Sequence, residues 1–144
     1  MGHRNWIVIA DSAYPEQVSP GVITIYTGQS QIATVREVMK ILAGTRHVTP
    51  DVFLDSELKY LTDAMAPGIS RYKAQLKQAF GTRPTQSMLH EKLISTLDES
   101  GKTFRVIILK TTLTLPYTSV FLRLNCAYWG DVKDAKLRAV MPKQ

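Results

Sequence analysis

The chain opens with Gly2-His3-Arg4-Asn5-Trp6-Ile7-Val8-Ile9-Ala10-Asp11, and this stretch indicates the class of fold. The apolar run from Trp6 to Ala10 has the length and the β-branched content of a buried strand. Tyr14-Pro15 stops any continuation, because proline has no amide N–H and restricts the residue before it. The first strand of an open α/β sheet is usually central, so we expect this strand inside a sheet.

Two titratable residues flank the expected strand. Asp11 follows it directly, and ligands of open α/β sheets bind beyond the carboxyl ends of the strands. His3 precedes it and cannot easily reach Asp11 within one subunit, although it could serve a site shared with a neighbouring copy. On spacing alone, the favoured interpretation is structural: His3 is a terminal residue in solvent and Asp11 is a strand-end cap.

Strands and helices alternate along the rest of the chain. We expect strands at 22–26, 51–54, 104–109 and 117–126, and helices at 31–43, 57–66, 69–80, 85–99 and 131–140. Ser30 is a suitable N-cap for the first of these helices, and Gly44 is a typical residue to end it. The alternation predicts a single α/β domain over residues 1–144 with a largely parallel sheet.

The composition is that of an ordinary soluble globular protein, with 44% hydrophobic and 21% charged residues. The longest apolar runs are about strand length, far short of the ~20 residues of a membrane span. The N-terminus lacks a signal-peptide pattern, and Cys126 stands alone in an apolar run. We therefore expect a cytoplasmic protein with no membrane partner and with its cysteine in the core.

The formal net charge of +6 raises the question of a nucleic-acid partner. The basic residues are dispersed, however, and the closest group is Lys133, Lys136 and Arg138 near the C-terminus. The sequence contains no basic run with interleaved aromatic residues. The favoured interpretation is that these basic residues lie on faces exposed to solvent, so we expect no nucleic-acid partner.

Standard catalytic motifs are absent from the sequence. Gly28 has no second glycine or lysine at the spacing of a phosphate-binding loop, and no G-x-S-x-G elbow occurs. The three histidines, at positions 3, 47 and 90, are too scattered to indicate a metal site by spacing.

Two other groups of polar residues could carry chemistry. Tyr117-Thr118-Ser119 stands at the entrance of the last expected strand, where a tyrosine and two hydroxyls can hydrogen-bond a polyol. The alternative is a plain turn with Tyr117 packed on the core. His90, near Lys92, lies on the flank of the leucine face of its expected helix. A partly buried structural histidine is the favoured interpretation of His90, and a ligand-binding histidine is the alternative.

Both ends of the chain resemble the D-ribose pyranase / L-fucose mutarotase (RbsD/FucU) family. Its members show a Gly-His, a short apolar strand, an Asp eight residues after the His and a turn with proline. Gly2-His3 and the segment from Asp11 to Pro15 match this spacing. Members also have a tyrosine segment that leads into an apolar last strand, which residues 116–122 resemble. The resemblance covers nearly the whole chain and implies an RbsD-like, three-layer αβα fold.

The resemblance also implies a function, that of a monosaccharide mutarotase or pyranase. Such an isomerase interconverts the cyclic forms of a free sugar by acid–base ring opening and reclosure, without a metal or organic cofactor. His3 would be the catalytic acid or base, and Asp11 would assist proton transfer and bind sugar hydroxyls. The segment Tyr117-Thr118-Ser119 would bind the sugar, with His90 as a further candidate contact. Family members assemble as pentameric rings or decamers with the site at a subunit interface, so we expect a homo-oligomer.

Several departures from the family leave the sugar and the activity open. The family's Asn after the tyrosine is Ser119 here, and its His or Arg upstream of the tyrosine corresponds to Ser95. Either His90 or Lys92 takes the place of that residue, or nothing does. Members also carry a helix before the Gly-His, and the stretch 127–144 extends past their usual end. The alternative function is therefore a non-catalytic sugar-binding or accessory protein.

Overall fold

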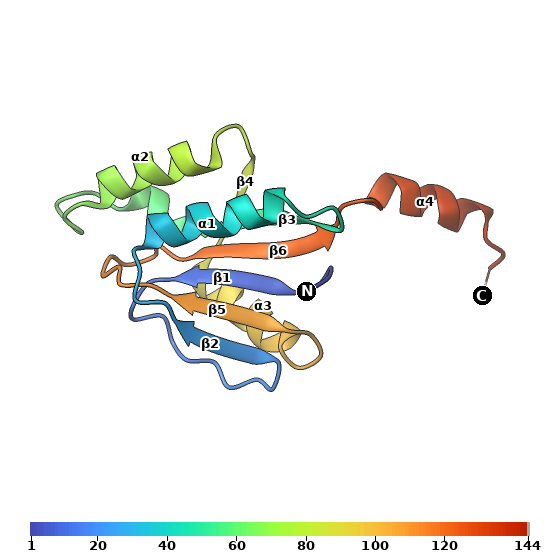
Figure 1. The fold of residues 1–144 in the computed structure, drawn as a ribbon, viewed down its shortest axis with the longest axis horizontal. Helices are drawn as coiled ribbons and strands as arrows, with labels where there is room; N and C mark the ends of the chain where they lie inside the picture. The colour runs from blue at the N-terminus through green and yellow to red at the C-terminus, as the bar shows by residue number, and fades with distance from the viewer. Residues whose placement is uncertain (144) are drawn as a thin grey trace.

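The fold was analysed in a computed structural model that describes residues 1–143 (Figure 1). In chain order the elements are β1 (Trp6–Ala10), β2 (Val22–Tyr26), α1 (Gln31–Ala43), β3 (Val48–Asp55), the 3₁₀ helix η1 (Ser56–Tyr60), α2 (Ile69–Phe80), β4 (Thr85–Met88), α3 (His90–Ser100), β5 (Val106–Lys110), β6 (Val120–Cys126) and α4 (Asp131–Val140). None of the helices within residues 1–143 has the length and apolar character needed to cross a membrane.

The strands form one six-stranded sheet in the order β2-β5-β1-β6-β3-β4. Parallel pairs join β1 with β5, β5 with β2, and β3 with β4, whereas β6 is antiparallel to both β1 and β3. The predicted, largely parallel sheet with β1 in its interior is therefore confirmed. The carboxyl ends of the five parallel strands and the start of β6 share one edge of the sheet, which we call the carboxyl edge.

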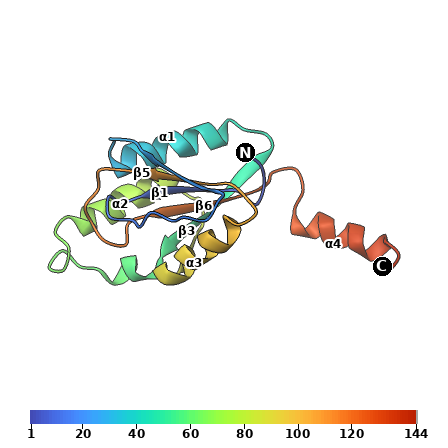
Figure 2. The same cartoon turned by 90° about the horizontal axis from the view of Figure 1, so that it is seen from below.

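Helices cover both faces of the sheet, which gives the predicted three layers (Figure 2). On one face, Val35 of α1 and Leu76 of α2 belong to a buried cluster that includes Ile9 of β1. On the other face, Leu97 of α3 packs in a second cluster that includes Val8 of β1. Successive side chains of a strand point to opposite faces, so β1 contributes to both halves of the core.

The last helix, α4, extends away from the body of the molecule (Figure 1). None of its residues is buried. It follows the end of β6 and therefore starts at the edge of the sheet opposite the carboxyl edge.

One predicted element, the helix at 85–99, is wrong in its first turn. The helix starts at His90, and residues Thr85–Met88 form an edge strand that pairs in parallel with β3. Pairing with β3 outweighs the leucine spacing here, because Pro84 lets the chain enter extended and β-branched Thr85 suits a strand.

Three smaller differences concern the helix at 57–66, the start of the last strand and Cys126. The helix predicted at 57–66 is only the short 3₁₀ helix η1. The last strand begins at Val120 rather than at 117, because Tyr117 has a left-handed backbone with φ of 56° and cannot continue a strand. Cys126 is half-buried at the end of β6 and does not belong to the core.

Candidate functional site

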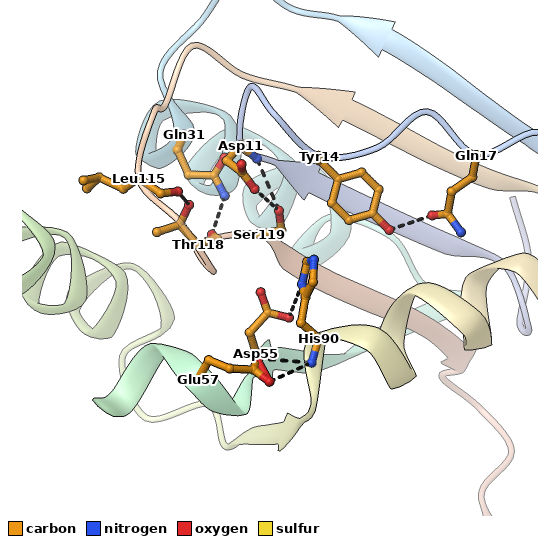
Figure 3. Close-up of polar contacts among 10 residues, drawn as sticks. All are labelled: Asp11, Tyr14, Gln17, Gln31, Asp55, Glu57, His90, Leu115, Thr118 and Ser119. Atoms are coloured by element: carbon orange, nitrogen blue, oxygen red, sulfur yellow. Dashed lines mark hydrogen bonds and ion pairs between the residues drawn. The ribbon is translucent and has the colours of Figure 1, made fainter. Parts of the chain in front are cut away.

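The carboxyl edge of the sheet gathers polar residues from four separate parts of the sequence (Figure 3). Asp11 follows β1, Asp55 is the last residue of β3, and His90 starts α3 just after β4. Tyr117 and Ser119 precede β6, which begins at this edge because it runs antiparallel to β1. The topology therefore joins side chains that lie as many as 108 positions apart in the sequence.

Ser119 holds Asp11 in place. The Ser119 hydroxyl donates to Asp11 Oδ1 at 2.8 Å and accepts from the Asp11 amide N–H at 3.2 Å. Ser119 is buried, whereas Asp11 is only partly buried and lines the pocket described below. Ser119 thus orients the carboxylate from behind.

Thr118 is also buried, and its carbonyl group is engaged within the chain. That carbonyl accepts hydrogen bonds from the Tyr72 hydroxyl at 2.5 Å and from Gln31 Nε2 at 2.9 Å. Gln31 also donates to the carbonyl of Ile9 at 2.9 Å, so it links the segment before β6 to the end of β1. Neither Thr118 nor Ser119 lines the pocket, and the direct sugar contacts predicted for both residues have no support in their positions.

Asp55 and His90 form a buried pair. Asp55 Oδ1 lies 3.0 Å from His90 Nδ1, with the side chain of Asp55 fully buried and that of His90 18% exposed. Burial raises the pKa of Asp55 from 3.8 to about 6, and the hydrogen bond and charge of His90 oppose this rise. An ionised Asp55 accepts a hydrogen bond from Nδ1–H, which leaves His90 Nε2 free to accept a proton. Figure 3 shows that second ring nitrogen on the side of His90 away from Asp55.

Glu57 fixes the start of the helix that carries His90. Its carboxylate oxygens accept from the His90 backbone N–H at 3.1 and 3.2 Å. Leu89, at the N-cap of α3, makes no side-chain cap bond, so Glu57 supplies the acceptor from another element. His90 is therefore held at its backbone by Glu57 and at its ring by Asp55.

Two tyrosine rings stand edge-on to the His90 imidazole. The ring centroid of Tyr117 is 5.4 Å from that of His90, and the ring centroid of Tyr14 is 6.2 Å away. The buried Tyr14 hydroxyl donates to Gln17 Oε1 at 2.6 Å, and burial raises its pKa, so it remains protonated. Tyr117 is 38% exposed, and its left-handed backbone costs ~1–3 kcal/mol for a non-glycine residue. Strain of this kind clusters at functional sites.

Four of the side chains described above line a single pocket of about 420 Å³. Its functional groups are Asp11, His90, Tyr14 and Tyr117, and residues 12, 13, 15 and 114–116 complete the lining. The volume falls in the range of small-molecule sites. A carboxylate and an imidazole can bind and transfer protons, and aromatic rings offer an apolar surface beside them. Within residues 1–143, no group of three His, Cys, Asp or Glu side chains could hold a metal ion.

His3 lies at the other edge of the sheet. It is exposed and lines a separate groove of about 770 Å³, together with Asp51, Arg123 and residues of α4. Arg123 Nη2 donates to Asp51 Oδ2 at 2.8 Å in that groove. The whole length of β1 separates His3 from Asp11, so the two predicted catalytic residues do not meet within one chain.

Sequence reasoning missed the role of Asp55, which lies between the strand predicted at 51–54 and the helix predicted at 57–66. Asp55 stands at the N-cap of η1 but makes no side-chain cap bond, because its carboxylate turns to His90. The available signal was its position at the end of a buried strand, which repeats the pattern of Asp11. Ser95 donates to the Lys92 carbonyl on the exposed side of α3 and does not line the pocket. Of the two possible replacements for the family's charged residue, His90 lines the pocket and Lys92 does not.

The fold and the site together define an α/β protein with a small-molecule pocket at the carboxyl edge of its sheet.

No protein-family model and no curated protein sequence matches the chain. Solved structures of similar fold include RbsD from Bacillus subtilis complexed with D-ribose, at 20% identity over 85% of this chain and 83% of that chain, with a TM-score of 0.56. FucU from Bifidobacterium longum matches at 17% identity over 85% of this chain and 86% of that chain, with a TM-score of 0.53. The fucose mutarotase from Streptococcus pneumoniae, in complex with L-fucose, matches at 18% identity over 85% and 84% of the two chains, with a TM-score of 0.53. The chain therefore has an RbsD/FucU-like fold, as the resemblance at its two ends predicted.

Proposed function

We propose that the protein is a monosaccharide mutarotase or pyranase. The observation that carries this proposal is the pocket at the carboxyl edge that Asp11 and His90 both line, with Asp55 held against the His90 ring. The proposal is supported by the shared fold, since two proteins with that fold are complexed with a free monosaccharide, D-ribose or L-fucose. The single cysteine of the sequence, Cys126, suits a reducing compartment, so we place the activity in the cytoplasm.

The reaction needs one proton acceptor and one proton donor. The acceptor takes the proton of the anomeric hydroxyl, and the bond between the anomeric carbon and the ring oxygen breaks. The electron pair of that bond goes to the ring oxygen, which takes a proton from the donor and becomes a hydroxyl. The open-chain aldehyde then rotates about the bond next to its carbonyl and recloses, which returns both protons. Positioned acid–base groups accelerate such steps ~10²–10⁴-fold.

His90 suits the role of proton acceptor. Asp55 holds the Nδ1 side of the ring, and the buried carboxylate stabilises the imidazolium that forms when Nε2 takes a proton. Asp11, oriented by Ser119, binds sugar hydroxyls and assists the proton transfer. Tyr117 packs beside His90 and binds the sugar through its ring or hydroxyl.

His3 is the proposed proton donor, and it reaches the pocket from a neighbouring copy. The exposed position of His3 leaves it available to another chain. This arrangement keeps the role that the family resemblance gives to His3 and explains why His3 and Asp11 lie at opposite edges of the sheet. The proposal therefore includes a homo-oligomer, with pentameric rings or a decamer as the family implies.

An apolar surface supports the homo-oligomer. On the sheet face that carries α1, Ile23 and Ile25 of the edge strand β2 are 43% and 46% exposed. They stand in register with Ile107 and Leu109 of β5, which are half-buried on the same face. Aliphatic side chains that continue past the covering helix favour contact with another subunit. We call these four residues the β2–β5 patch.

Exchange NMR between the anomers of D-ribose, L-fucose and D-galactose tests the function. The protein should accelerate exchange for at least one of these sugars. His90→Ala should lower the accelerated rate on the order of 10²-fold, because it removes the proton acceptor. His47→Ala is the matched control, since His47 is exposed and does not line this pocket. Failure to accelerate exchange of any of the three sugars, or an unchanged rate in His90→Ala, contradicts the proposal.

The second candidate function is a sugar-binding protein without catalysis. It is favoured by Ser119, which stands where the family has Asn and is committed to Asp11. Saturation-transfer NMR distinguishes the two functions, because a binding protein would show contact with a sugar whose anomers exchange at the uncatalysed rate.

A further inference from the structure

A second pocket, of about 430 Å³, lies between α2, η1 and the edge strand β4. Figure 1 shows β4 beside the C-terminal end of α2. No residue lines both this pocket and the candidate site. We call it the α2–β4 pocket. Asp55, the partner of His90, is on its lining, and the other lining residues take no part in the proposed function.

The floor of the α2–β4 pocket is apolar. Leu58 of η1 and Leu76 and Phe80 of α2 are buried side chains of the main core, and half-buried Leu54 of β3 adjoins them. An apolar floor in a cavity of this size favours a ligand with an apolar body.

The walls of the pocket are basic. Lys59, Lys73, Lys77 and Arg83 all line it, and none of them takes part in an ion pair within residues 1–143. Two of them are held by carbonyl groups: Lys73 Nζ donates to Leu61 O at 2.6 Å, and Arg83 Nη1 donates to Pro50 O at 3.2 Å. Each of these two cations keeps further N–H donors for a ligand.

Negative charge on the lining is limited to one residue. Asp55 is the only acidic residue that lines the pocket, and its side chain is fully buried and paired with His90. The nearby Glu57 carboxylate is occupied by the His90 backbone N–H, and Asp63 accepts from the Ser70 N–H. The four cations therefore line the pocket without an ion-pair partner on its wall, and a bound anion would supply one.

We propose that the α2–β4 pocket binds a phosphate monoester with an apolar body. A phosphate dianion matches a lining with several cations better than a single carboxylate does, because it offers more charge and more acceptor oxygens. The exposed hydroxyls of Thr85 and Ser87, at the pocket wall, can donate to the same group. The apolar body lies on the leucine and phenylalanine floor.

Binding of 1-naphthyl phosphate, measured by isothermal titration calorimetry, tests this proposal. It should bind at least about tenfold more tightly than 1-naphthol or inorganic phosphate, because only the ester uses both the floor and the cations. Equal affinity for 1-naphthol, equal affinity for inorganic phosphate, or no binding of the ester overturns the proposal.

Charge variants locate the site. Lys77→Gln should weaken binding of 1-naphthyl phosphate, and Lys77→Gln with Arg83→Gln should weaken it about tenfold or more. The matched control is Lys40→Gln with Lys92→Gln, which removes the same charge from α1 and from α3. Equal weakening in the control would show a general charge effect and overturn the proposal. The Lys77 change tests it even if the Arg83 change disturbs the fold, since the side chain of Lys77 makes no hydrogen bond or ion pair among the described residues.

Two further measurements separate this proposal from the others. Asp11→Asn should bind 1-naphthyl phosphate as the unchanged protein does, whether or not sugar exchange is catalysed, because Asp11 lines the candidate site and not this pocket. Sedimentation velocity should show the same oligomeric state with and without Lys77→Gln. A change in that state would identify the pocket as a subunit contact and overturn the proposal.

Discussion

The two edges of the sheet that β1 connects differ in how firmly the chain holds their polar side chains. At the carboxyl edge, Asp11 has Ser119 behind it and shares a pocket with His90, whose ring is paired with the buried Asp55. At the opposite edge, His3 is exposed and lines a groove together with residues of α4, a helix with no buried residue. The side chains of the carboxyl edge are held by partners within the chain, whereas His3 makes no side-chain hydrogen bond or ion pair among residues 1–143.

The difference indicates that the two edges have different roles when copies of the chain assemble. The carboxyl edge holds its groups by hydrogen bonds within the chain, so it can bind a ligand without a large change of structure. At the His3 edge, the titratable side chain of His3 is exposed. We infer that His3 at this edge acts in the pocket of a neighbouring subunit. The predictions below test this difference between the two edges.

The largest expected effect comes from changing His3 in one set of chains and Asp11 in another. His3→Ala and Asp11→Asn should each lower sugar exchange on the order of 10²-fold. Oligomers mixed from equal amounts of the two variants should recover about a quarter of the unchanged rate. Each site needs an intact Asp11 from one copy and an intact His3 from its neighbour, and each of these has an even chance. Exchange NMR on the co-refolded mixture measures this recovery. No recovery would mean that the two residues do not act across a subunit interface.

The β2–β5 patch tests the same contrast through assembly. Ile25→Lys should dissociate the oligomer and reduce sugar exchange by a similar factor to His3→Ala, because the neighbouring His3 is no longer delivered. Val18→Lys is the control, since Val18 is 91% exposed in a loop. Sedimentation velocity gives the oligomeric state. An intact oligomer in Ile25→Lys would place the subunit contact elsewhere.

Asp55 makes the carboxyl edge sensitive to pH. Its pKa is raised to about 6 in the fold, so the folded state binds this proton more tightly than the unfolded chain does. The resulting stabilisation is present below pH 4 and is lost as the pH rises through about 6. Its Oδ2 atom is buried without a hydrogen-bond partner, which adds to the cost of the ionised form.

Asp55→Asn should remove that pH dependence. Urea unfolding gives the free energy of unfolding at pH 4 and at pH 7. From pH 4 to pH 7 this free energy should fall by up to about 3 kcal/mol more in the unchanged protein than in the variant. Sugar exchange at pH 7 should fall about tenfold in the variant, because Asn keeps the hydrogen bond to His90 but not the charge that stabilises an imidazolium. Identical pH profiles for the two proteins would show that Asp55 does not titrate in this range.

The smallest effect is expected at α4. Ending the chain after Gly130 should change the free energy of unfolding of the separated subunit by less than about 0.5 kcal/mol, because no residue of α4 is buried. Urea unfolding of Ile25→Lys with and without residues 131–144 measures it. A larger loss would show that α4 contributes to the fold of its own chain.

Much of the architecture could be predicted from local patterns. The β-branched run of β1 and its position in the sheet were predicted, and so was the cap of α1, where the Ser30 hydroxyl accepts from the Ala33 N–H. These features depend on residues within a few positions of one another. The strand Thr85–Met88 was not predicted, because its extended form depends on pairing with β3, about thirty positions earlier in the chain.

The site divides in the same way. Asp11 could be placed at the carboxyl edge from the sequence, because it directly follows an apolar strand. The pairing of His90 with Asp55, 35 positions away, could not be placed, because it requires β3 and β4 to lie side by side. The buried position of Ser119 behind Asp11 required the antiparallel return of β6.

The sequence by itself determined the α/β class, the central strand and the residues at its two ends, since periodicity and turn residues act locally along the chain. Only the tertiary structure decided which of the candidate residues share a pocket. The order and direction of the strands are set by burial and pairing over the whole sheet, and they bring His90 to Asp11 while they keep His3 apart from both.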